Sequence, residues 1–188
     1  DAFTGEILHL EDLISFDVAG RVTGMVTSGS DEMHCAVETA QPFSDADVRI
    51  VAGNAALTDA NGEFNVEEMG GGAVTLQSPV TGRHFQVTDA SGPDELLQSL
   101  VVPPGPVAFV HNASNASELL RAQANAFVQS NRARDWVMNY HPTYLFDQAD
   151  FPVTVNRTDE LCPGNAWYDI GTMHYCRSRD FPSPAAQD

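Results

Sequence analysis

The chain has 188 residues, enough for one ordinary domain or two small ones with a substantial apolar core. Its nine basic residues are all Arg and face 26 Asp and Glu, so the formal net charge is −17. Phosphate groups are bound by clustered cations, and this balance therefore argues against nucleic acid and anionic membranes as partners. We expect a soluble protein from a salty or extracellular setting.

The opening residues 1–14 are acidic, show no signal-peptide pattern and are expected to form a lead-in segment. No apolar run approaches the ~20 residues of a transmembrane helix. Residues 182–188 contain no closing element. The sequence is therefore expected to be part of a longer protein.

Residues 15–92 are predicted to form an antiparallel β-sandwich. Short alternating apolar runs are separated by Gly, Asn, Asp and Pro turns, which is typical of such folds. The strongest turn signal is Asn61-Gly62 in the stretch TDANGEF, and it predicts a hairpin. Asp59, Asn61 and Glu63 alternate there and could bind Ca²⁺, but no bidentate acid stands at the right distance. Turns favour the same residues, so calcium stays an unsupported alternative.

Residues 93–105 are rich in Pro and Gly and are predicted to be a linker. The second half, residues 106–188, is predicted to be α+β, with one long helix beside a sheet. Asn115 and Glu118 form a capping-box pattern at the helix start, and His141-Pro142 indicates its end. The stretches VAFVHN, FPVTVN, NAWYDI and TMHYC have the character of strands.

Three cysteines leave one unpaired. Cys162 and Cys176 flank a predicted strand and form the natural disulfide pair, which implies an oxidising, secreted context. Two free thiols in a reduced cytosolic protein are the alternative. Cys35 is left over and is expected to be a small buried apolar residue.

No catalytic or metal-binding constellation emerges from residue spacing. The six histidines are never within five residues of one another, so no local metal pair exists, and no G-x-S-x-G elbow is present. Asp45 and Asp47 alternate before a strand and are most simply solvated turn residues. The histidines are His9, His34, His84, His111, His141 and His174.

The stretch CPGNAWYDIGTMHYC, residues 162–176, reads as an exposed edge strand. An extended peptide can add to such an edge as a further strand. Asn165 could then hold the peptide backbone through its amide, while Trp167 and Tyr168 shape a cleft. The plainer interpretation makes both aromatics ordinary sheet and core residues.

The segment NAWYDIGTMHYC resembles the edge-strand motif of the thermolysin-like and fungalysin-like zinc metallopeptidases. The order of long helix, connecting strand and Asn-Ala strand agrees with that family over residues 106–188. The first half, through its G-x-V, DADVRI and TDANGEF stretches, resembles a carboxypeptidase-regulatory-like β-sandwich. The fold implied is a sandwich followed by an incomplete N-terminal lobe of a metallopeptidase.

The resemblance implies roles for four residues. Asn165 would hydrogen-bond the main chain of a peptide or protein substrate, the carbonyl of Ala166 would accept from it, and Trp167 and Tyr168 would stand beside the cleft. The zinc ligands and the general base have no counterpart in this sequence, so zinc and the rest of the peptidase domain are expected outside it. The chain alone is therefore expected to be inactive. No family role attaches to His174, which is expected to be a strand surface residue.

Three functional hypotheses follow. The first is a segment of a secreted zinc-dependent endopeptidase that contributes the peptide-binding edge strand. The second is a non-enzymatic extracellular binding or adhesion protein built on the sandwich. The third is an inhibitory or prosegment-like module that occupies a peptidase cleft in trans. An H-E-x-x-H motif soon after Asp188 would separate the first from the others.

Overall fold

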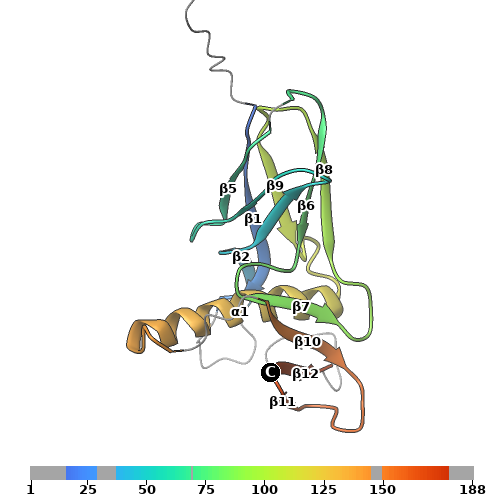
Figure 1. The fold of residues 1–188 in the computed structure, drawn as a ribbon. Coiled ribbons are helices and arrows are strands. Elements are labelled where there is room, and N and C mark those ends of the chain that lie inside the picture. Colours follow the sequence, from blue (N-terminus) through green and yellow to red (C-terminus); the bar gives the residue numbers. More distant parts are fainter. Residues whose placement is uncertain (1–15, 29–36, 69, 145–149, 178–188) are drawn as a thin grey trace, which may run out of the picture.

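The computed structural model describes residues 16–28, 37–68, 70–144 and 150–177. Three four-stranded sheets and one long helix make up this part of the chain (Figure 1). The prediction of a mainly β protein with a helix beside a sheet is therefore confirmed. The predicted lead-in 1–14 and the predictions for Cys35, His9 and His34 lie outside the described residues.

The first sheet is organised around the long strand β1 (Val18–Thr27). Strands β2 (Glu38–Pro42) and β5 (Glu63–Val66) pair antiparallel with the two ends of one edge of β1. Strand β9 (Val107–His111) pairs with its other edge and runs parallel to it. The sheet is thus mixed, although the sequence pattern predicted antiparallel pairing only.

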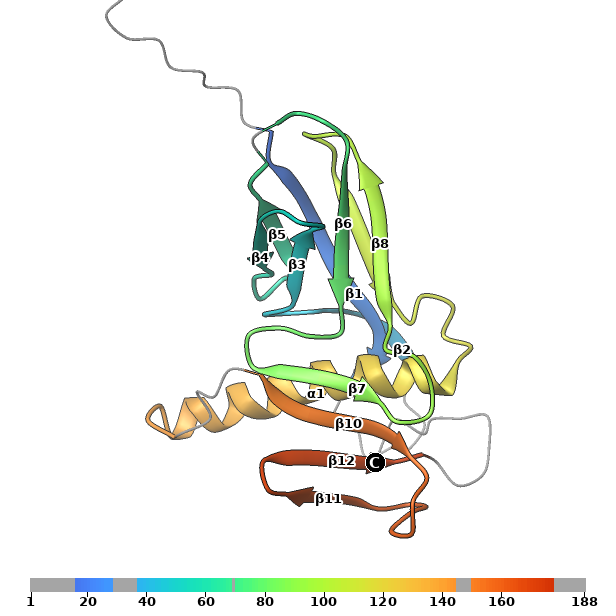
Figure 2. The same cartoon turned by 45° about the vertical axis from the view of Figure 1, so that its right-hand side comes forward.

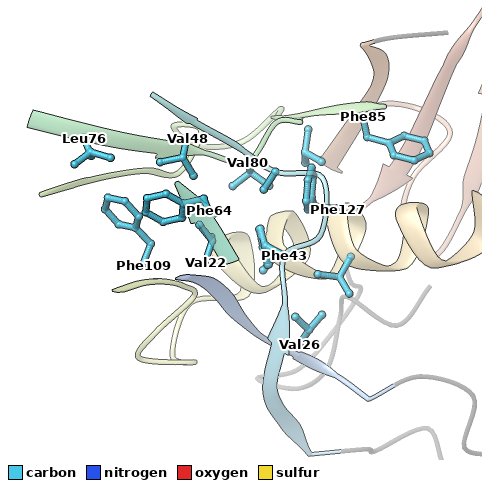
Figure 3. Close-up of a cluster of buried hydrophobic side chains, with 14 of the residues drawn as sticks. Val22, Val26, Phe43, Val48, Phe64, Leu76, Val80, Phe85, Phe109 and Phe127 are labelled. Atoms are coloured by element: carbon cyan, nitrogen blue, oxygen red, sulfur yellow. The ribbon is translucent and has the colours of Figure 1, made fainter. Parts of the chain in front are cut away.

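The second sheet is antiparallel and has the order β4-β3-β6-β8. Its strands are β4 (Ala55–Leu57), β3 (Asp47–Ile50), β6 (Val74–Pro79) and β8 (Leu96–Val101). Alternate residues of both sheets point inward and form one apolar core, in which Val48 and Leu76 face Val22, Phe64 and Phe109 (Figure 3).

The third sheet, of order β11-β12-β10-β7, lies across the end of the other two (Figure 2). Strands β7 (Phe85–Asp89), β10 (Phe151–Arg157) and β12 (Thr172–Cys176) are parallel, and β11 (Ala166–Asp169) is antiparallel to β12. Helix α1 (Glu118–Tyr140) contacts β7, β10 and β1, and so joins this sheet to the end of the first. No helix in the described ranges is long and apolar enough to cross a bilayer.

The predicted linker 93–105 contains strand β8, whose residues alternate between exposed and half-buried. The Pro and Gly residues on either side of this strand produced the linker interpretation, and the short strand between them was missed. Two strands that precede residues 93–105 in the chain also pair with strands that follow them. Strand β9 pairs with β1, and β7 pairs with β10.

Two local predictions need correction. The helix N-cap is Ser117, whose hydroxyl accepts from the N–H of Leu120, because Ser117 has the extended backbone that a cap requires. Asn115 has a left-handed backbone (φ 48°), and its amide bonds other partners. The turn at Gly62 does form (φ 78°), but it connects β4 of the second sheet to β5 of the first, since turn residues specify a reversal and not the pairing partner.

Candidate functional site

Strand β11 forms one edge of the third sheet (Figure 2). Within the described residues it pairs only with β12, through a hairpin in which Trp167 lies opposite His174 and Tyr168 opposite Met173. The structure therefore places the predicted residues Ala166, Trp167 and Tyr168 on an edge strand, with Asn165 immediately before it. An edge strand presents a row of N–H and C=O groups to an incoming chain.

The hydrogen-bond pattern determines which backbone groups face this open edge. The N–H of Cys176 donates to the carbonyl of Asn165 at 2.9 Å. Because bonding alternates along an antiparallel pair, residues 165, 167 and 169 direct their backbone groups toward β12. Ala166 and Tyr168 consequently direct their N–H and C=O groups away from β12, along the outer edge of the sheet.

Covalent and polar contacts hold the start of this hairpin. The structure contains the predicted disulfide between Cys162 and Cys176, which ties the loop before β11 to the end of β12. The Asn165 side chain is exposed and donates from Nδ2 to the carbonyl of Leu161 at 3.2 Å. A carboxamide has two N–H donors and a carbonyl acceptor, so one internal bond leaves the group able to bind a second chain.

One face of the hairpin carries an aromatic and polar cluster. His174 is 7% exposed as a residue, and its imidazole stacks on the indole of Trp167, with ring centroids 5.0 Å apart. The guanidinium of Arg157 lies 5.0 Å from the centre of the same indole, within the range of a cation–π contact. The expectation that His174 is a surface residue is wrong, because the indole and its polar neighbours cover it.

His174 also joins three strands by hydrogen bonds. Its Nδ1 lies 2.9 Å from Nη1 of Arg157 on β10, and its Nε2 lies 3.0 Å from Oδ1 of Asp169 on β11. The hydrogen bond with His174 lowers the pKa of the exposed Asp169 carboxyl, with smaller contributions from a hydrogen bond with Trp167 and the charge of Arg157. Asp169 is therefore ionised at neutral pH.

The opposite face of β11 is aromatic and exposed. Tyr168 is 65% exposed, and its ring stacks on that of Phe151 with centroids 6.2 Å apart. Ile170, at the hairpin turn, is fully exposed. Two faces with different chemistry therefore flank the open edge, one apolar and one built around Trp167 and Asp169.

A second histidine cluster, which residue spacing did not reveal, has the pattern of a catalytic relay. Oγ of Ser78 lies 3.1 Å from Nε2 of His111, and Nδ1 of His111 lies 2.9 Å from Oε2 of Glu95. The three residues come from β6, from the end of β9 and from just before β8, so only the folded chain brings them together. A serine, a histidine and a carboxylate in this order are the parts of a nucleophilic triad.

Burial excludes catalysis by this cluster in the present conformation. Ser78 and His111 are both 0% exposed, and the imidazole stacks on Phe43 with ring centroids 4.6 Å apart. The Glu95 carboxylate also accepts from the backbone N–H of Asn112 at 3.0 Å. The cluster is a satisfied polar contact within the core, and no substrate carbonyl can reach Ser78.

The described residues do not fit a metal ion. No group of three or more His, Cys, Asp and Glu side chains in these ranges is arranged to hold one. Oδ1 of Asp59 accepts instead from the backbone N–H groups of Asn61 and Glu63, both at 2.8 Å. That carboxylate oxygen therefore serves the turn, as the plainer interpretation of the TDANGEF stretch expected.

No protein-family model, no curated protein and no solved structure matches this chain.

Proposed function

We propose that the outer edge of β11 binds an extended peptide by strand addition. The observation that carries this proposal is the orientation of the Ala166 and Tyr168 backbone groups along an open sheet edge. Main-chain hydrogen bonds from these two residues would supply affinity. The exposed amide of Asn165 would add a side-chain contact to the peptide backbone, and Trp167 and Tyr168 would flank alternate peptide side chains.

We further propose that this edge belongs to a secreted zinc metallopeptidase. The support is the Asn-Ala-aromatic-aromatic sequence on an edge strand beside a long helix, which is the arrangement that the family resemblance implied. The disulfide supports an oxidising compartment. The described residues offer no zinc site, so the ligands would have to come from residues outside the described ranges.

The peptide-binding proposal is tested by removing one outward N–H. Ala166→Pro deletes the donor on the open side and leaves the bonds to β12, and proline is tolerated at such edge positions. Affinity for a fluorescein-labelled, end-blocked hexapeptide of alternating threonine and valine should fall about five- to tenfold, the effect of one lost hydrogen bond. Fluorescence anisotropy measures this affinity.

Ala166→Val is the matched control, since it adds bulk at the same exposed position and keeps the N–H. Its affinity should stay close to that of the unaltered chain. Equal binding by the Pro and Val variants would contradict strand addition at β11.

The peptidase assignment has a separate test in the coding sequence beyond Asp188. An H-E-x-x-H motif followed by a downstream Glu is expected there. A stop codon or an unrelated domain would remove the peptidase assignment and leave a non-enzymatic peptide-binding protein.

A further inference from the structure

His174 lies at the centre of the polar contacts that link β10, β12 and β11. Its imidazole bridges Arg157 and Asp169 at 2.9 and 3.0 Å, and it is nearly buried. Arg157 is held from its other side by Asp159. The bridge therefore runs from Asp159 through the guanidinium and the imidazole to the last residue of the edge strand.

The chemistry of the two partners sets the form of the imidazole. A guanidinium has only donors and stays protonated, so Nδ1 of His174 must accept from Arg157. The ring proton then resides on Nε2 and is donated to the carboxylate of Asp169. The contacts thus require neutral imidazole in the Nε2–H tautomer, with one acceptor and one donor on opposite sides of the ring.

This arrangement fixes two of the four residues of β11. Asp169 is held by its hydrogen bond to Nε2, and the indole of Trp167 contacts both the imidazole and the guanidinium. Ala166 and Tyr168 alternate with these two residues along the strand. Holding Trp167 and Asp169 in place therefore sets the direction in which the intervening backbone groups point.

We propose that His174 is a positioning residue for peptide binding, which in its Nε2–H form orients the outer edge of β11 toward the peptide. This inference rests on the proposed function of that edge. His174 would act through Trp167 and Asp169 and would not touch the peptide.

The test replaces His174 by glutamine, whose side-chain amide has both an acceptor and a donor, as the neutral imidazole does. Glutamine carries one acceptor and donors on its terminal group, so His174→Gln can accept from Arg157 and donate to Asp169. His174→Leu fills a similar space and makes neither bond. Affinity for the threonine–valine hexapeptide should stay within about twofold in His174→Gln and fall about tenfold in His174→Leu. His141→Gln, at the exposed end of α1, is the control and should bind as the unaltered chain does.

Two peptide-free measurements separate this inference from the proposed function. Long-range ¹H–¹⁵N NMR spectra should show a protonated Nε2 and a bare Nδ1 for His174 at neutral pH. Amide hydrogen exchange at Trp167 and Asp169, whose N–H groups face β12, should be faster in His174→Leu than in His174→Gln. The opposite tautomer, or equal exchange in both variants, would overturn the positioning role.

The binding data then decide the remaining outcomes. The expected tautomer and exchange could be found while the hexapeptide binds neither the unaltered chain nor any variant. In that case the proposed function is wrong, and the role of His174 in peptide binding is wrong with it. If the hexapeptide binds His174→Leu as tightly as His174→Gln, the positioning role is wrong while peptide binding stands.

Discussion

The two histidine clusters show how similar chemistry serves different ends in two regions of the molecule. His111 joins Ser78 and Glu95 between the first and second sheets, while His174 joins Arg157 and Asp169 on the hairpin of the third sheet. Each imidazole uses both ring nitrogens, and each stacks on an aromatic side chain.

Their surroundings differ. Every partner of His111 is buried or nearly so, and Phe43 and Phe127 continue the stack into the core. His174 has an exposed partner in Asp169 and lies one strand from an open edge. Triad-like distances therefore say little about function until access is considered. The cluster around His174, which lacks the order of a triad, is the one that lies beside an exposed sheet edge.

The largest expected effect on stability comes from the buried cluster of Ser78, His111 and Glu95. In His111→Leu, the buried Glu95 carboxylate loses its imidazole partner and the Ser78 hydroxyl loses its hydrogen bond with Nε2. Breaking a buried pair of this kind costs about 3 to 5 kcal/mol of the free energy of unfolding. Urea unfolding followed by circular dichroism measures the loss.

The exposed His141 provides the comparison for that variant. His141→Leu should change the free energy of unfolding by less than about 0.5 kcal/mol. A loss below about 1 kcal/mol in His111→Leu would show that the cluster contributes little to the stability of the fold.

The next effect concerns the hairpin alone. Replacing both Cys162 and Cys176 by Ser removes a loop constraint worth about 3 kcal/mol. Because the disulfide joins only the loop before β11 to the end of β12, amide exchange should accelerate in β11 and β12. The amides of β1 and β6 should exchange as before. Equal acceleration in all four strands would mean that the hairpin and the sandwich unfold as one unit.

The smallest effect is the acid response of the same hairpin. The folded pKa of Asp169 lies below its ordinary value, chiefly because of its hydrogen bond with His174. Its stabilising contribution is therefore complete above the ordinary carboxyl range, near pH 4, and is lost as the pH falls through the lowered folded pKa. Amide exchange at Trp167 should show this loss, and Asp169→Asn should abolish it. An unchanged acid response in that variant would assign the effect to another group.

Much of the fold followed from local sequence patterns. Alternating apolar residues predicted most of the strands, and His141-Pro142 predicted the end of α1. The pairing of the strands could not be predicted in this way, because periodicity shows which face of a strand is buried and not which strand lies beside it. The sequence pattern places β7 in the predicted sandwich of residues 15–92, yet β7 pairs with β10, and β8, β9 and α1 lie between the two strands in the chain.

The candidate site was predicted in part for the same reason. Adjacent residues such as Asn165 to Tyr168 can be recognised as a motif, and the flanking cysteines suggested their own pairing. The bridge through Arg157, His174 and Asp169 depends on the register between β10, β11 and β12, which no local pattern encodes. Ser78, His111 and Glu95 also lie on different strands or next to them, and their contact likewise cannot be predicted from a local sequence pattern.

The central claim, that β11 binds an extended chain along its outer edge, is tested most directly by an ¹H–¹⁵N NMR titration with the threonine–valine hexapeptide. The alternation of backbone groups predicts large shifts for the amides of Ala166 and Tyr168. The amide of Trp167, which faces β12, should shift less. Equal shifts along the strand, or shifts confined to residues outside the hairpin, would contradict the account.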